Sequence, residues 1–66
     1  MKVASLADVK NGFSHFAEVA QSERVIVTRH GKPVAIIVGV EGESIEALLS
    51  ASEAEFWKIV RRKEAP

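Results

Sequence analysis

The sequence predicts a small α+β domain in which an antiparallel sheet, made of a β-hairpin and a short N-terminal strand, packs with N-terminal helices and is followed by C-terminal helices. Three observations favour this fold. Apolar residues recur at helical spacing near the N-terminus, two β-branched segments flank a glycine-containing turn, and a serine-capped amphipathic segment comes last. With 66 residues, the sequence forms one domain at most.

The N-terminal segment has the pattern of two short helices. Its apolar residues fall at steps of three and four, which gives one apolar face: Leu6, Val9, Phe13, Phe16 and Ala20. Ser5 precedes this pattern and Asp8 follows three residues later, as in a capping box. Gly12 is unfavourable inside a helix, so the sequence predicts one helix from Leu6 to about Asn11 and another from Phe13 to about Ser22.

The middle of the sequence predicts a β-hairpin. The segment Arg24 to Arg29 is rich in β-branched residues, and Gly31 allows a positive φ in the turn that follows. Pro33 then precedes a second strand, Val34 to Val40, which is apolar on both faces. A strand of this kind needs cover on both sides. The N-terminal helices supply one cover, and we expect a second subunit to supply the other or to cover the edge.

Two serines mark the starts of two C-terminal helices. Ser44 is a suitable cap for a short helix carrying Ile45, Leu48 and Leu49. Ser52 and Glu55 form a capping box that opens a last helix ending at about Lys63. We expect this last helix to expose an apolar stripe formed by Phe56, Ile59 and Val60, with Trp57 beside it.

Length and composition limit what the chain can be. A chain this short folds marginally without disulfides, a metal or oligomerisation. It has no cysteine and only two histidines, so we expect no cofactor and no metal, and we predict an obligate dimer. The N-terminus lacks a signal peptide, and no apolar run is long enough to span a membrane, so we expect a cytoplasmic protein without a membrane partner.

The residues do not form a recognisable catalytic arrangement, and charge gives only a weak indication of a nucleic-acid partner. No serine and histidine stand in a nucleophilic motif, so the sequence predicts a protein that is not an enzyme. The formal net charge is zero, but residues 1–40 hold five Lys or Arg against three acids. His30 lies beside Arg29 and Lys32, where it is either a plain turn residue or a phosphate contact.

Two motifs carry a resemblance to a known family. The segment VIVTRHGKPVAIIV, residues 25–38, closely resembles the hairpin signature of the Phd/YefM family of antitoxins. Upstream, the segment KNGFSHF, residues 10–16, looks like the first-helix motif of that family, a basic residue and asparagine followed by a Leu/Phe-Ser-x-Leu/Phe pattern. The resemblance covers roughly residues 3–50.

The resemblance implies a dimeric Phd/YefM-like repressor that is also an inhibitor. Family members bind a palindromic operator through the N-terminal part and fold the C-terminal segment along a toxin. We therefore expect residues 1–50 to dimerise and bind DNA, and residues 51–66 to bind toxin. The expected DNA-binding residues are Lys10, Asn11, Arg29, His30 and Lys32. The toxins of this family include RelE-like ribonucleases, PIN-domain nucleases and Doc-like enzymes, and higher-order complexes with toxin are possible.

The last helix has the residues of a helix that binds in a groove of its partner. A helix of about a dozen residues is marginal alone in water, and aromatic and arginine side chains often carry interface energy. The expected toxin-binding residues are Phe56, Trp57, Ile59, Val60 and Arg61. The alternative is that Phe56 and Val60 pack on the dimer core. Two other functions stay open: a toxin inhibitor that does not bind DNA, and a free-standing transcriptional repressor.

Overall fold

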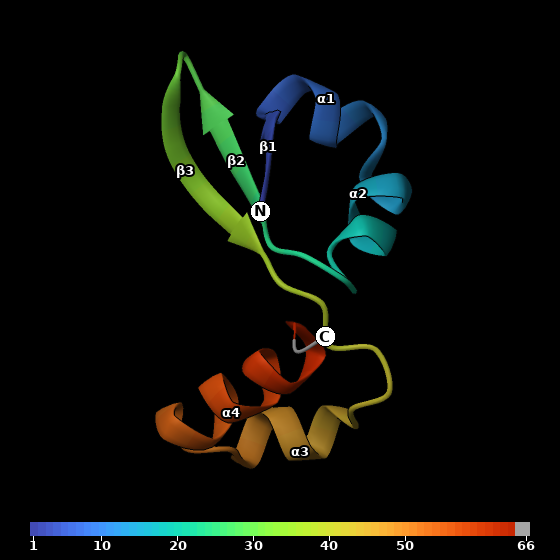
Figure 1. The fold of residues 1–66 in the computed structure, drawn as a ribbon, viewed down its shortest axis with the longest axis vertical. Coiled ribbons are helices and arrows are strands. Elements are labelled where there is room, and N and C mark those ends of the chain that lie inside the picture. The colour runs from blue at the N-terminus through green and yellow to red at the C-terminus, as the bar shows by residue number, and fades with distance from the viewer. Residues whose placement is uncertain (65–66) are drawn as a thin grey trace.

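The computed structural model describes residues 1–64 and contains three strands and four helices in that part of the chain. Figure 1 shows two parts, with the sheet and the first two helices at one end and the last two helices at the other. The elements in chain order are β1 (Lys2–Ser5), α1 (Leu6–Asn11), α2 (Phe13–Val19), β2 (Val25–Arg29), β3 (Lys32–Ile37), α3 (Ile45–Ser50) and α4 (Glu53–Glu64).

The sheet is mixed, so the predicted all-antiparallel sheet is wrong in one respect. The strand order is β1-β2-β3, and β2 pairs with β3 in the antiparallel sense. β1 instead runs parallel to β2, with Lys2 opposite Val25 and Ser5 opposite Thr28. The reason is the connection: α1 and α2 lie between β1 and β2, and a helical crossover returns the chain to the end from which it started. The α+β class and the hairpin are confirmed.

The hairpin closes through a two-residue turn. Arg29 pairs with Lys32, and the two residues between them, His30 and Gly31, have φ angles of 52° and 76°. Two positive φ values are typical of the turn whose twist matches that of the flanking strands. The sequence predicted the role of Gly31 but not the positive φ of His30. Between Val27 and Thr28 the register shifts, as at a β-bulge.

The predicted helix starts are confirmed, but the predicted ends of α2 and β3 are not. The Ser5 hydroxyl accepts a hydrogen bond from the Asp8 backbone N–H at 3.1 Å, and Gly12 separates α1 from α2. α2 ends at Val19 rather than near Ser22, because the chain tightens into turns there, with the Ser22 N–H bonded to the Val19 carbonyl at 3.0 Å. β3 begins at Lys32 and ends at Ile37, three residues short of the predicted end.

The core beneath the sheet is built from small side chains. Its buried members are Ala4, Val9, Ala20, Val25 and Val27, with Phe16, Val19 and Ile37 packed against them. These residues come from β1, α1, the end of α2, and β2, so the N-terminal helices cover one face of the sheet as predicted. The edge strand β3 stays open: Val34 is 48% exposed and Ile36 is 56% exposed.

The C-terminal helices form a second unit that adjoins the sheet. Figure 1 shows α3 and α4 side by side, joined to β3 by the segment 38–44. The Ser44 hydroxyl caps α3 by accepting from the Ala47 N–H at 3.0 Å. The capping box at Ser52 is confirmed in both directions, with Ser52 N–H to Glu55 Oε1 at 2.9 Å and Glu55 N–H to Ser52 Oγ at 3.2 Å.

Candidate functional site

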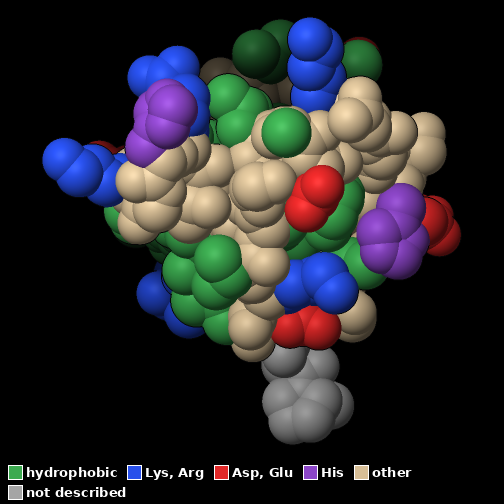
Figure 2. Space-filling model, turned by 90° about the horizontal axis from the view of Figure 1, so that it is seen from above, with side chains coloured by type: hydrophobic (Ala, Val, Ile, Leu, Met, Phe, Trp, Pro, Cys, Tyr) green, Lys and Arg blue, Asp and Glu red, His purple; other side chains and the backbone are tan. Residues whose placement is uncertain are grey.

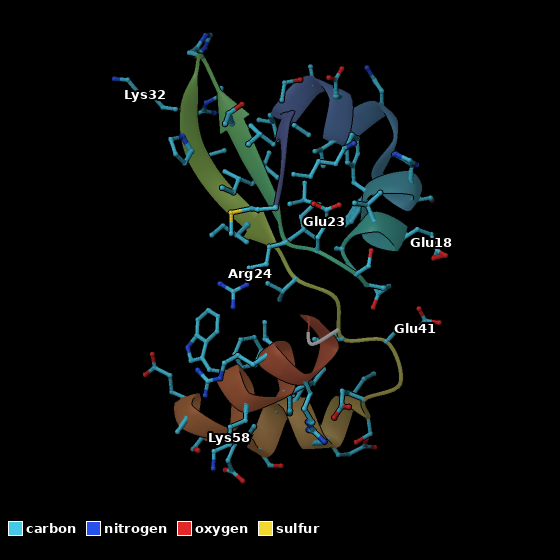
Figure 3. The ribbon with its side chains drawn as sticks, viewed as in Figure 1. Glu18, Glu23, Arg24, Lys32, Glu41 and Lys58 are labelled. Atoms are coloured by element: carbon cyan, nitrogen blue, oxygen red, sulfur yellow. The ribbon has the colours of Figure 1, made fainter. Side chains whose placement is uncertain are left out.

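Three of the predicted DNA-binding residues meet at the tip of the hairpin. Arg29 ends β2, Lys32 begins β3, and His30 lies in the turn between them. All three are exposed. Because the two-residue turn is held by the paired strands on both sides, the three side chains come from a short, defined segment of backbone. Figure 3 shows Lys32 projecting outward from this tip. Such a tip is suited to contacting phosphate groups.

The other two predicted DNA-binding residues lie on a different element at the same end of the molecule. Lys10 and Asn11 are exposed in the last turn of α1. Since Ser5 pairs with Thr28, α1 begins beside the hairpin and carries these residues roughly 6–8 Å along its axis. Figure 2 looks down on this end and shows basic side chains in separate places with acidic ones between them. The structure therefore brings the five residues to one end, but not into one continuous patch.

The predicted toxin-binding residues divide into exposed and buried ones. Trp57 is 39% exposed, Arg61 is exposed and Phe56 is half-buried. Ile59 and Val60 are only 7% and 1% exposed, so the expectation that the whole stripe is exposed is wrong for these two. They are buried outside the core cluster beneath the sheet. In Figure 1 α3 lies alongside α4, and Ile59 lines the groove between these two helices, so part of the apolar face of α4 is turned toward its own chain.

One contact between the two halves of the molecule was not predicted from the sequence. The Arg24 guanidinium carbon lies 5.5 Å from the centre of the Trp57 ring, within the range of a cation–π interaction. Arg24 is placed by the sheet, because its carbonyl accepts a hydrogen bond from the Lys2 N–H at 2.9 Å. In Figure 3 the Arg24 side chain extends from the lower end of the sheet toward α4. Nothing in the local sequence relates these two residues, which are 33 positions apart.

A second contact fixes the segment that leads from β3 to α3. The Gln21 side chain accepts a hydrogen bond from the Glu41 N–H at 3.0 Å and donates one to the Ala17 carbonyl at 2.8 Å. Gly39 is buried beside it, and an added Cβ would lie only 2.6 Å from the Cα of Gln21. One signal for this approach was present in the sequence, since a glycine within an apolar run often marks close contact between backbones.

An open groove of about 840 Å³ lies between the two C-terminal helices. Its lining combines acidic, basic and small side chains: Glu43, Ala47, Ser50, Ala51, Glu55, Lys58, Ile59, Arg61 and Arg62. The hydrogen bonds from the backbone and hydroxyl of Ser52, with a smaller contribution from Lys58, lower the pKa of Glu55. Glu55 is therefore ionised at neutral pH and completes the cap at the start of α4.

Comparison with known protein families adds one decisive observation. Residues 1–64 match the family model described as antitoxin Phd_YefM of type II toxin–antitoxin systems. The chain belongs to the Phd/YefM antitoxin family. No match was found among curated proteins, and none was found among solved structures. The match extends beyond the two motifs to include α3 and α4.

Membership in the Phd/YefM family decides two of the broader predictions. The family consists of antitoxins, so this chain is not an enzyme. Family membership also implies that the chain has a cognate toxin as its partner. Within residues 1–64, no helix of this antitoxin is long and apolar enough to cross a membrane.

Proposed function

We propose that this antitoxin neutralises its cognate toxin through residues 51–66 and represses its own operon by binding operator DNA as a dimer in the cytoplasm. The observation that carries the proposal is the family match, which spans the hairpin half and the C-terminal helices together. Two features of the structure support it. Exposed basic residues lie on the hairpin tip and on α1, and α4 carries aromatic and cationic side chains.

Dimerisation is supported by the open edge of the sheet. β3 is the edge strand, and its apolar residues Val34 and Ile36 are about half exposed. An edge strand with exposed apolar side chains is a surface that natural proteins cover. A second copy of the chain provides such cover and places a second hairpin tip and a second α1 on the DNA. A palindromic operator would then be read by two equivalent sets of contacts.

DNA binding is assigned to Lys10, Asn11, Arg29, His30 and Lys32. Contacts from such residues to phosphates make affinity fall steeply with salt, with a slope of roughly 0.9 for each contact. We expect a Lys10→Ala, Arg29→Ala double variant to lose at least tenfold in affinity for the upstream DNA of its own operon and to show a shallower salt slope. Fluorescence anisotropy over a salt series measures both. Lys58→Ala, an exposed lysine of α4, is the matched control. Normal binding by the double variant contradicts the assignment.

Toxin binding is assigned to Phe56, Trp57, Ile59, Val60 and Arg61. We expect the product of the adjacent gene, when co-expressed, to co-purify with the full chain and not with a chain ending at Ser50. Because truncation also removes the cover over neighbouring side chains, a Phe56→Ala, Trp57→Ala double variant should repeat the loss. Phe13→Ala, an exposed aromatic residue on α2, should leave binding unchanged. Retention of toxin by the double variant and by the truncated chain rules out this assignment.

A second candidate is a toxin inhibitor that does not bind DNA. The observation that favours it is the dispersed basic charge at the hairpin end, together with a formal net charge of zero. The anisotropy series decides between the two, because the inhibitor alone would show only weak binding that does not depend on Lys10 and Arg29. A free-standing repressor is disfavoured, since the family implies a toxin. RelE-like, PIN-domain and Doc-like toxins all remain candidates for the partner.

A further inference from the structure

The C-terminal helix α4 is docked on the chain in a way that hides part of its own proposed toxin-binding stripe. Val60 is 1% exposed and Ile59 is 7% exposed, while Trp57, one turn before, remains partly open. A partner that uses Ile59 and Val60 as anchors therefore cannot reach them in this arrangement. The conformation of free α4 and the binding of toxin compete for the same side chains.

Two contacts hold this closed arrangement. At the sheet, Arg24 lies over the ring of Trp57 at 5.5 Å. At the linker, the Gln21 side chain holds the Glu41 N–H at 3.0 Å, and Gly39 packs closely against the end of α2. The linker contact fixes the segment that leads into α3, and the contact of Trp57 with Arg24 joins α4 to the residue that precedes β2. Arg24 belongs to the core half of the chain and is outside the proposed toxin-binding and DNA-binding residues.

We propose that α4 is an intramolecular latch: the Arg24–Trp57 contact keeps Ile59 and Val60 covered, and α4 must open before toxin binds them. This inference rests on the proposed toxin-binding function. Where only the open form is competent, the apparent dissociation constant equals the intrinsic one divided by the open fraction. A cation–π contact at a partly exposed site shifts such an equilibrium by about two- to fivefold. Loss of the Arg24 contact therefore increases the open fraction by about that factor.

The opening of α4 can be measured without toxin, because the chain has no cysteine. Val60→Cys places one thiol at the buried position of α4, and Val27→Cys places one in the core of the sheet, where Val27 is equally buried. The rate of thiol labelling then reports opening at each position. We expect position 60 to be labelled at least tenfold faster than position 27, since it needs only local opening. Equal rates at the two positions would show that α4 opens only with global unfolding and would overturn the latch.

The role of Arg24 is tested in the same background. Arg24→Met should accelerate labelling at position 60 by about two- to fivefold and leave position 27 unchanged, and Arg24→Lys should restore part of the protection. In a Trp57→Leu background, Arg24→Met should have no further effect, which isolates the pair from other contacts of Arg24. An Arg24 effect that persists in the Trp57→Leu background would refute the assignment to this contact. Amide hydrogen exchange of the unsubstituted chain, comparing α4 with β2, gives the same comparison should a cysteine variant fold poorly.

A binding experiment with toxin distinguishes a failure of the latch from a failure of the proposed toxin-binding function. The probe is the purified product of the adjacent reading frame, titrated against the full chain and against Arg24→Met, both without added cysteines. Tighter binding by Arg24→Met, by the same factor as the labelling rate, is the expected result. Equal affinities would show that toxin binds the closed form and would overturn the competition. If labelling changes as expected but neither protein binds the probe, the latch stands and the assignment of this toxin fails.

Discussion

Replacement of Gly39 by alanine tests how the two halves of the molecule are joined. The added Cβ would meet the Ala20 carbonyl oxygen and lie 2.6 Å from the Gln21 Cα, and these backbone atoms cannot rotate away. Overpacking of this kind costs about 1–3 kcal/mol. A displaced linker also weakens the hydrogen bond between the Glu41 N–H and Gln21, which contributes about 1 kcal/mol. The reduced entropy of the unfolded chain offsets up to about 1 kcal/mol.

The expected net loss for Gly39→Ala is therefore about 1–3 kcal/mol. In a domain of this size, that loss lowers the Tm by roughly 4–24 °C. Circular dichroism melts at one fixed protein concentration measure it, because dimerisation would make the Tm depend on concentration. Gly12→Ala is the matched control: its added Cβ would lie at an ordinary 3.5 Å from the Asp8 carbonyl oxygen, and its φ of −143° is negative. A Tm for Gly39→Ala equal to or above that of Gly12→Ala would refute this account of the linker.

Two further predictions concern the cap of α4 and the edge of the sheet. Folding lowers the pKa of the Glu55 carboxyl, so the ionised carboxylate stabilises the cap fully above the ordinary glutamate range, and this stabilisation is lost as the pH falls through the lowered pKa. Helicity, followed by circular dichroism at 222 nm, should therefore fall over that pH window in the natural chain. The Glu55→Gln variant should lose less helicity over the same window. Ile36→Lys places a charge on the exposed face of β3, so sedimentation should show a shift from dimer to monomer, whereas Lys2→Ala on β1, at the other edge of the sheet, should leave the dimer intact.

The sequence was most informative where the structure depends on neighbours in the chain. Ser5, Ser44 and Ser52 all cap helices as predicted, because a cap joins a hydroxyl to a backbone N–H three residues later. The hairpin followed from β-branched segments and a glycine turn for the same reason. These local contacts contribute about 1 kcal/mol each, and they depend on few residues.

The sequence was less informative where the structure depends on distant residues. The direction of β1 is set by the crossover through α1 and α2, and periodicity within Lys2–Ser5 does not encode it. The contact of Arg24 with Trp57 joins elements that only the fold brings together. An amphipathic stripe likewise has the same pattern whether it faces solvent, a partner or its own chain. This is why the sequence left open whether Val60 is exposed or packed within the molecule, and why it did not predict the burial of Ile59.

The distribution of side-chain sizes connects these observations with the need for partners. The buried residues of the sheet core are no larger than valine, while larger apolar side chains such as Phe13, Ile36 and Leu49 are exposed. Burial of a large side chain stabilises by about 1.5–3 kcal/mol, so the chain leaves much of its apolar stabilisation unused. Among the exposed apolar residues, Val34 and Ile36 lie on β3, and Ile45 and Leu49 lie on α3. Two different partners fit this arrangement: a second copy on the sheet edge, and a toxin whose contact surface extends from α4 onto α3.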